Sequence, residues 1–218
     1  LSGVWEYKLN NLERWQAEEL DQLIDFLASL NQLKRCSSLE EKVAKQIELI
    51  KRISFASQQP DSESFIQRFN RESSHSFLVE NCLSIEDIND LSFDSSEIID
   101  CQVQLSIVFE TLFDFPSSRL AAYGTLRPGE SNYHQVEIIK GVWTPGAVSG
   151  ILFEKDGYPV LNFTKMADEI EVQVLESKQL PDHWGRLDDF EGSNYERILV
   201  PVKTFGRGYL VCNLYNSV

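Results

Sequence analysis

The segment Arg119–Gly129 contains the first residues whose types and spacing could do chemistry. An apolar run ends at Gly124, and a short polar loop closed by Pro128 and Gly129 follows it. A strand that ends in a glycine and a polar loop exposes several backbone N–H groups in one direction, which suits an anion or a carbonyl oxygen that gains negative charge. Because Gly124 has no Cβ, a ligand can lie against the backbone there. The alternative interpretation is a strand followed by an ordinary surface turn.

Glu191 is the second chemical candidate, and it lies at the exit of a predicted helix, just before Gly192. Apolar surface from Phe190 and the preceding strands would raise the pKa of the Glu191 carboxyl toward the range that a general base needs. A solvated surface acid is the alternative. Asp188 and Asp189 are expected to lie on exposed faces or to cap the helix, because neighbours on a helix point apart.

The loop Tyr123–Gly129 resembles the signature loop of the gamma-glutamylcyclotransferase-like superfamily, in the branch of gamma-glutamylamine cyclotransferases and avirulence-induced proteins. Further matches follow in register. They are Asn132, Gly146–Phe153 leading into Gly157–Leu161, Leu187–Gly192 and Tyr195–Arg197. The resemblance covers roughly residues 117–217 and says nothing about residues 1–116.

The resemblance implies an internal cyclisation. The alpha-amino group of a small gamma-glutamyl compound attacks its own gamma-carbonyl, which releases 5-oxoproline and an amine without a metal or a cofactor. It also implies that Glu191 is the general acid/base. The implied or candidate substrate-binding residues are Tyr123, Gly124, Thr125, Leu126, Arg127 and Tyr195. Core or strand packing is the alternative for the two tyrosines, solvation in an exposed turn is the alternative for Arg127, and Asn132 could brace the loop.

The elements that must position these groups are short strands. Alternating polar and apolar residues predict strands, and one helix is expected between the fourth and the fifth of them. The predicted strands are 120–123, 148–154, 158–162, 170–175, 197–203 and 209–216, with the helix at 179–190 and a short helix or turn at 133–139. Asp156 and Gly157 predict a hairpin turn. This pattern indicates a small mixed β-barrel with one main helix, and the resemblance implies the same fold.

The sequence pattern of residues 1–116 predicts helices. Periodic apolar residues predict one long helix or two in tandem over 4–33, and a capping box at Ser37–Glu41 opens another helix. Shorter helices are expected after Pro60 and Ser84. The helix after Ser95 is expected to bury Ile98, Ile99, Val103, Ile107, Val108 and Leu112. The prediction is an α+β protein with a helical domain at 1–116 and a barrel domain at 117–218.

Charge and cysteine content narrow the classes of partner. The net charge is −14, and residues 1–118 hold 10 Lys and Arg against 21 Asp and Glu, which argues against nucleic acid or an anionic membrane as partner. The four cysteines form no C-x-x-C pair and have no histidine at ligand spacing, so neither a zinc framework nor a disulfide scaffold is predicted. Reduced thiols, with no signal peptide or membrane span visible, predict a cytoplasmic protein.

Three functions are consistent with the sequence. The first is a gamma-glutamylcyclotransferase-type enzyme. The second is a non-catalytic ligand-binding or regulatory module whose helical domain docks a partner. The third is a processing enzyme that removes a gamma-glutamyl group from a carrier-bound intermediate. Residues 1–116 could correspondingly form a lid, a dimerisation element or a docking surface.

Overall fold

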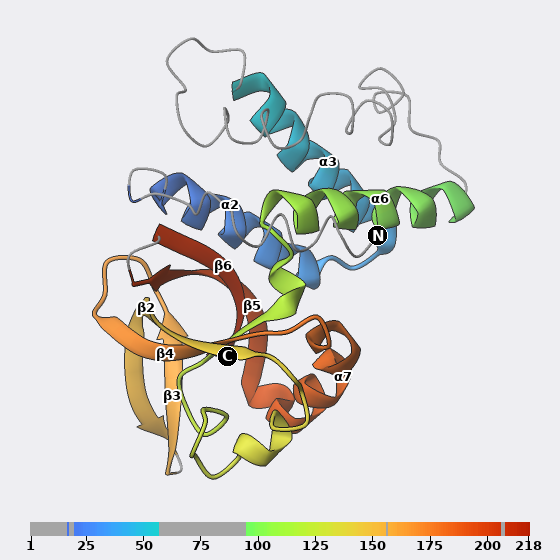
Figure 1. Cartoon of the computed structure of the whole chain (residues 1–218). Helices are drawn as coiled ribbons and strands as arrows, with labels where there is room; N and C mark the ends of the chain where they lie inside the picture. The colour runs from blue at the N-terminus through green and yellow to red at the C-terminus, as the bar shows by residue number, and fades with distance from the viewer. Residues whose placement is uncertain (1–16, 18–19, 57–94, 156, 206–207) are drawn as a thin grey trace.

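Helices precede strands in the computed structural model, which describes residues 17, 20–56, 95–155, 157–205 and 208–218 (Figure 1). The α+β class predicted from the sequence is confirmed. The helices are α2 (Leu20–Gln32), α3 (Leu39–Ala56), α6 (Ser95–Leu112) and α7 (Leu180–Glu191), with short 3-10 turns η2 (Leu33–Arg35), η4 (Pro116–Ser118), η5 (Tyr133–Gln135) and η6 (Gly192–Asn194). The predicted short helices after Pro60 and Ser84, and the first part of the predicted helix at 4–33, lie outside the described residues.

Six strands form one sheet at the predicted places in the chain, except that β2 begins at Val142 and was predicted to begin at residue 148. They are β1 (Arg119–Ala122), β2 (Val142–Lys155), β3 (Tyr158–Phe163), β4 (Glu169–Glu176), β5 (Tyr195–Thr204) and β6 (Gly208–Ser217). Their order is β3-β2-β4-β1-β6-β5. β1 and β6 run parallel, whereas the other neighbouring pairs run antiparallel. The sheet is therefore mixed, as predicted.

The sheet closes on itself between β2 and β5. Gly146 pairs with Thr204 and Ala147 pairs with Lys203, so that β2, β4, β1, β6 and β5 make a closed barrel. β3 remains outside this ring and forms a hairpin with the second half of β2. Gly157 has a φ of +82° in the hairpin turn, a conformation that glycine adopts without steric cost.

Both faces of β1 are buried, which explains its continuous apolar run. Ala121 faces the barrel interior with residues such as Val174 and Val202. Leu120 faces outward and packs under α7. A strand that is covered on two sides needs no polar alternation.

Helix α7 covers one side of the barrel through a single apolar face. Leu180, Trp184 and Leu187 recur at helical spacing and are buried against the outer face of the sheet. The helix has Pro181 in its first turn and ends at Gly192, whose φ is +67°. This ending fixes Glu191 as the last helical residue.

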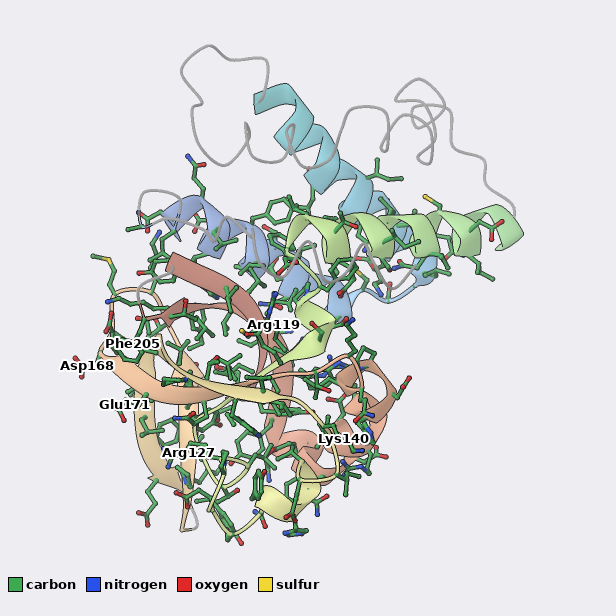
Figure 2. The ribbon with its side chains drawn as sticks, viewed as in Figure 1. Arg119, Arg127, Lys140, Asp168, Glu171 and Phe205 are labelled. Atoms are coloured by element: carbon green, nitrogen blue, oxygen red, sulfur yellow. The ribbon has the colours of Figure 1, made fainter. Side chains whose placement is uncertain are left out.

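The N-terminal helices share a core that includes part of the barrel. Leu23 and Leu27 of α2 are buried with Phe113, and Val211 of β6 belongs to the same cluster. Figure 2 shows Arg119 where the helices meet the barrel, and its buried guanidinium forms ion pairs with Asp114 and Glu176. The helical layer and the barrel are therefore in direct contact.

The capping box at the start of α3 is confirmed. The Ser38 hydroxyl accepts a hydrogen bond from the Glu41 N–H at 3.2 Å, and the Glu41 carboxylate accepts one from the Ser37 N–H at 2.8 Å. Val43 and Ile47 are buried on the predicted face. These bonds satisfy N–H groups that the first turn of a helix leaves without acceptors.

The predicted inner face of α6 is partly wrong. Ile99, Val103 and Ile107 are 54%, 50% and 41% exposed. Two apolar stripes run along this helix, and helical spacing alone does not decide which one faces the core. The buried stripe consists of Ile98, Cys101, Leu105, Phe109 and Leu112. The side chain of Val108 lies outside the described part.

None of the helices that the structure describes combines the length and the apolar character needed to cross a bilayer.

Candidate active site

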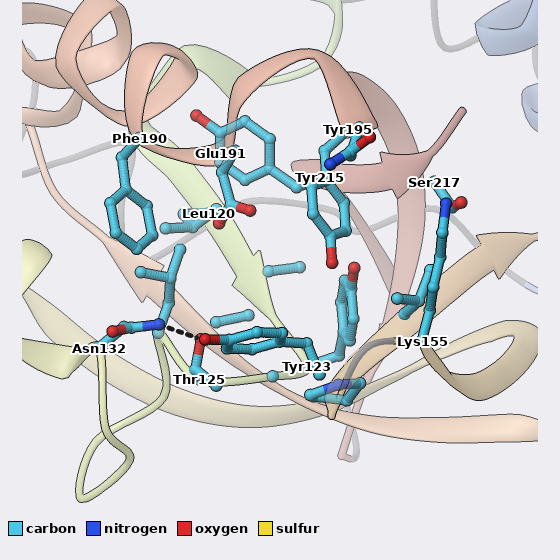
Figure 3. A pocket seen from close by; sticks show the side chains of 18 residues that line it. Leu120, Tyr123, Thr125, Asn132, Lys155, Phe190, Glu191, Tyr195, Tyr215 and Ser217 are labelled. Carbon is cyan, nitrogen blue, oxygen red and sulfur yellow. Dashed lines mark hydrogen bonds between the residues drawn. The ribbon is translucent and has the colours of Figure 1, made fainter.

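A cavity of about 440 Å³ lies beside β1. Figure 3 shows side chains that line it. Its walls come from β1 and the loop that follows it (120–126, with Asn132), the β2–β3 hairpin, the end of α7, the start of β5 and the end of β6. The two stretches with chemical potential in the sequence, Tyr123–Leu126 and Glu191, therefore line one space.

The loop after β1 uses its carbonyl groups to hold its own shape. The Gly124 carbonyl accepts a hydrogen bond from the Arg127 N–H at 3.2 Å, and the Thr125 carbonyl accepts one from the Asn132 N–H at 3.0 Å. The Asn132 side chain also donates to the Thr125 hydroxyl at 2.9 Å (Figure 3). By contrast, the N–H groups of Gly124, Thr125 and Leu126 have no acceptor among the residues that the structure describes. They are available to oxygen atoms of a ligand.

Gly124 lies directly beneath the hairpin. A Cβ at this position would lie 3.1 Å from Cγ of Pro159, which is closer than most side-chain contacts allow. The absence of a side chain therefore lets the β2–β3 hairpin approach the loop and form the opposite wall of the cavity.

Glu191 reaches into the cavity from the end of α7, with Thr125 and Asn132 across from it (Figure 3). Its side chain is half-buried, and no hydrogen bond to its carboxylate comes from the described residues. Burial disfavours the charged form and raises the pKa of Glu191 from 4.5 to about 7. A carboxyl group with this pKa can both accept and donate a proton near neutral pH.

Three tyrosines surround Glu191. Tyr123 follows β1, Tyr195 begins β5, and Tyr215 comes from β6. Burial raises the pKa of Tyr123 and Tyr215, and burial together with the nearby Glu191 charge raises the pKa of Tyr195. The three phenols therefore stay protonated at neutral pH and can act as neutral hydrogen-bonding groups.

Asp188 differs from its expected role as an exposed or capping residue. Its carboxylate accepts two hydrogen bonds from Arg197, at 2.8 and 3.0 Å, and one from the Tyr215 hydroxyl at 2.8 Å. Burial pushes the pKa of Asp188 upward, but the hydrogen bonds from Arg197 and Tyr215 outweigh it and lower the pKa overall. The Arg197 guanidinium also lies 4.4 Å from the ring centre of Trp184. Asp188 thus ties α7 to β5 and β6.

Arg127 does not line the cavity. Its guanidinium donates to the Gly124 carbonyl at 3.2 Å and to Glu130 at 3.2 Å, so it braces the loop from outside. Lys155, at the tip of the hairpin, does line the cavity and is the only cationic side chain among the described residues that do so. Sequence reasoning missed Lys155 because the hairpin signal indicated a turn and carried no information about what the turn would face.

The site offers a titratable carboxyl, neutral phenols, one lysine and a row of backbone N–H groups. Within the described part of the chain, no group of three or more His, Cys, Asp and Glu side chains could hold a metal ion. These groups can hold an oxyanion, bind a carboxylate and move a proton.

The part of the chain that forms the barrel is similar to known proteins. Residues 120–216 match the family model described as gamma-glutamyl cyclotransferase, AIG2-like. An uncharacterized protein from Pyrococcus horikoshii is 24% identical over 45% of this chain and 76% of its own, with a TM-score of 0.35. An AIG2-like protein from Mus musculus is 21% identical over 46% and 77%, with a TM-score of 0.39. YkqA from Bacillus subtilis is 30% identical over 46% and 35%, also with a TM-score of 0.39. None of the curated proteins matches the chain.

Proposed function

We propose that the protein converts a small gamma-glutamyl compound into 5-oxoproline and a free amine, on the premise that residues 120–216 match the family model described as gamma-glutamyl cyclotransferase, AIG2-like. One observation carries the proposal: a carboxyl group with a pKa near 7 shares a cavity with three backbone N–H groups that lack acceptors among the described residues. The first group suits proton transfer, and the second suits a developing oxyanion.

The reaction needs a single proton carrier because the substrate supplies its own nucleophile. Glu191 takes a proton from the substrate's alpha-ammonium group, and the free amine attacks the gamma-carbonyl carbon. The carbonyl oxygen becomes an oxyanion in the tetrahedral intermediate. As the bond to the leaving nitrogen breaks, that nitrogen receives the proton from Glu191, and the oxyanion collapses to the ring carbonyl. The ring nitrogen still carries an excess proton, which passes through the Glu191 carboxylate to the released amine. The amine therefore leaves as an ammonium, and Glu191 returns to its carboxylate form.

Holding the substrate in a folded shape supplies the larger part of the rate. Well-oriented intramolecular reactions have effective molarities of ~10⁵–10⁸ M. Proton transfer by Glu191 adds ~10²–10⁴ in rate. Each N–H of Gly124, Thr125 or Leu126 that contacts the oxyanion adds about 10²–10³. Asn132 and Arg127 keep the loop in shape through the bonds described above.

Lys155 and the tyrosines complete the binding site. Every gamma-glutamyl compound carries an alpha-carboxylate, and the Lys155 ammonium supplies the opposite charge from the hairpin side. Tyr123 and Tyr195 remain protonated beside Glu191, so they offer hydrogen bonds to the substrate without adding negative charge.

The test is release of 5-oxoproline from gamma-glutamyl amines, gamma-glutamyl amino acids and glutathione. Glu191→Gln keeps the size of the side chain and removes its proton chemistry, so we expect turnover to fall by about 10²–10⁴ while the fold is retained. Glu137→Gln is the matched control, because Glu137 is exposed and does not line the cavity. Full activity in Glu191→Gln would overturn the assignment of the base. Binding of these compounds by the wild-type protein without 5-oxoproline release would instead favour a ligand-binding module.

A further inference from the structure

Strand β5 has one side that is only partly covered by the sheet. It pairs with β6 from Tyr195 to Thr204, but it pairs with β2 only at Lys203 and Thr204. The rest of this side has no partner strand among the described strands. A strand edge left in this way presents N–H and C=O groups that need other partners.

Asn31 of α2 supplies partners for the middle of that edge. Its side-chain amide donates to the Leu199 carbonyl at 2.9 Å and accepts from the Leu199 N–H at 2.8 Å. This reciprocal pair of bonds is the one that a residue of a neighbouring antiparallel strand would exchange with Leu199. The side chain of a helical residue therefore acts as one residue of a strand.

Further contacts hold α2 and η2 against the same region. The Arg35 guanidinium donates to Glu196 at 3.3 Å. The core of the helical layer includes Val211, and Leu199 and Tyr209 pack against it. Figure 1 shows α2 lying along the β5–β6 end of the barrel. The interface thus combines apolar burial with hydrogen bonds to the strand backbone.

The same strand carries part of the cavity wall. β5 begins at Tyr195, and only the short turn η6 separates Tyr195 from Glu191. The residues that follow are held one after another: Glu196 by Arg35, Arg197 by Asp188, and Leu199 by Asn31.

We propose that the segment Leu20–Arg35 takes the place of a missing edge strand of the barrel, and that Asn31 is a positioning residue for Tyr195 and Glu191. The helical layer then supports from behind a strand that carries part of the cavity wall, and removal of residues 1–116 would open the barrel. The role of Asn31 in positioning Glu191 for catalysis rests on the function proposed above, whereas its structural role in completing the edge of β5 does not.

Loss of the Asn31 amide should let the start of β5 move and let water reach Glu191. The charged or titratable groups that face Glu191 are Tyr123 after β1, Tyr195 on β5, Tyr215 on β6 and Lys155 on the hairpin. Because the phenols are neutral, their charge does not set the pKa of Glu191. A displaced β5 would change the burial of Glu191, and through it the pKa of its carboxyl.

The experiment compares Asn31→Ala with two controls in the full chain. Ser29→Ala removes a hydroxyl that bonds only within α2, at 3.0 Å to the Asp25 carbonyl. Ile98→Val weakens the core of the helical layer from α6 and leaves the Asn31 amide in place. The measurements are amide hydrogen exchange at Leu199, the pKa of the Glu191 carboxyl by NMR titration, and kcat for 5-oxoproline release.

We expect Asn31→Ala to speed exchange at Leu199 by about tenfold and to lower the pKa of Glu191 toward its ordinary value, with kcat falling more than KM rises. Both controls should leave the titration of Glu191 unchanged. Unchanged exchange and titration in folded Asn31→Ala would overturn the proposal. If Asn31→Ala does not fold, the same measurements are made on Asn31→Asp. This variant keeps the acceptor for the Leu199 N–H and removes the donor to the Leu199 carbonyl.

The two proposals fail in different ways. A shifted Glu191 titration in a protein that releases no 5-oxoproline would leave the role of Asn31 intact and overturn the cyclisation. An active wild-type protein with an unchanged Glu191 titration in Asn31→Ala would support the cyclisation and overturn the role of Asn31.

Discussion

The Tyr215 hydroxyl donates a 2.8 Å hydrogen bond to Asp188, one helical turn before Glu191 on α7. Tyr215 also lines the cavity. This one hydrogen bond therefore connects the cavity wall to the last turn of α7, which carries Glu191. We expect Tyr215→Phe to lower the free energy of unfolding by about 1 kcal/mol in urea titrations, because Asp188 keeps Arg197 and loses one donor. Tyr133→Phe, outside the cavity, is the control. An unchanged unfolding midpoint in Tyr215→Phe would contradict this view.

The activity of the protein should rise with pH through neutrality. In the proposed reaction Glu191 must be ionised to take a proton, and burial raises its pKa to about 7. We therefore expect kcat/KM for 5-oxoproline release to climb through about pH 7 and to level off above it. A profile that is already flat between about pH 5 and pH 8 would show that another group is the base.

The same group should make stability depend on pH in the opposite direction. Its folded pKa lies above the ordinary value of 4.5, so the folded state binds more protons than the unfolded state between about pH 4.5 and pH 7. Ionisation of Glu191 therefore costs stability as the pH rises through this window. We expect Glu191→Gln to be more stable than the wild type at about pH 8 and similar to it at about pH 4, by denaturant unfolding. Equal differences at both pH values would contradict the shift.

Two glycines offer a matched pair of substitutions. A Cβ at Gly124 would press on Pro159 at the cavity, whereas a Cβ at Gly185, inside α7, meets nothing within 4 Å. We expect Gly124→Ala to lower kcat/KM by displacing the hairpin from the loop. We expect Gly185→Ala to stabilise the protein by about 0.5–1 kcal/mol, because alanine favours a helix interior, and to leave activity unchanged. Thermal unfolding and 5-oxoproline assays check both, and an active Gly124→Ala would argue against a loop that needs close packing.

Lys155 should contribute to substrate binding and little to the chemical step. Lys155→Met removes the only cationic side chain among the described cavity residues, so we expect KM to rise about tenfold with kcat nearly unchanged. Lys140→Met is the control, because Lys140 is exposed and lies away from the cavity. Rescue by Lys155→Arg would support the role of charge. A fall in kcat without a change in KM would contradict it.

The strands were predictable because their patterns are local. Alternation and the Asp-Gly turn located β2 to β6 to within a few residues, and β2 begins earlier than predicted because Val142–Ala147 pairs with β4 in a stretch that does not alternate. The face of α6 was not predictable in the same way. Ile98 and Ile99 belong to two different apolar stripes of the helix. Only packing against α2 and α3 selects the stripe of Ile98 as the buried one.

The site was predictable as far as it follows from short motifs. The loop 123–126 and Glu191 line one cavity, although their sequence separation gives no sign of it. Asp188 was misread because its partners, Arg197 and Tyr215, lie on two later strands. Contacts of this kind depend on strand order, which local periodicity does not specify.

The strand order also bears on how the chain is made. β1 comes first in the barrel along the chain, yet it lies between β4 and β6, and Leu120 pairs with Asn213. A growing polypeptide that has not yet extended β6 beyond the ribosome leaves one edge of β1 bare and lacks Val211, against which the helical layer packs. The cavity can therefore assemble only after the codons for Gly208–Ser217 have been translated.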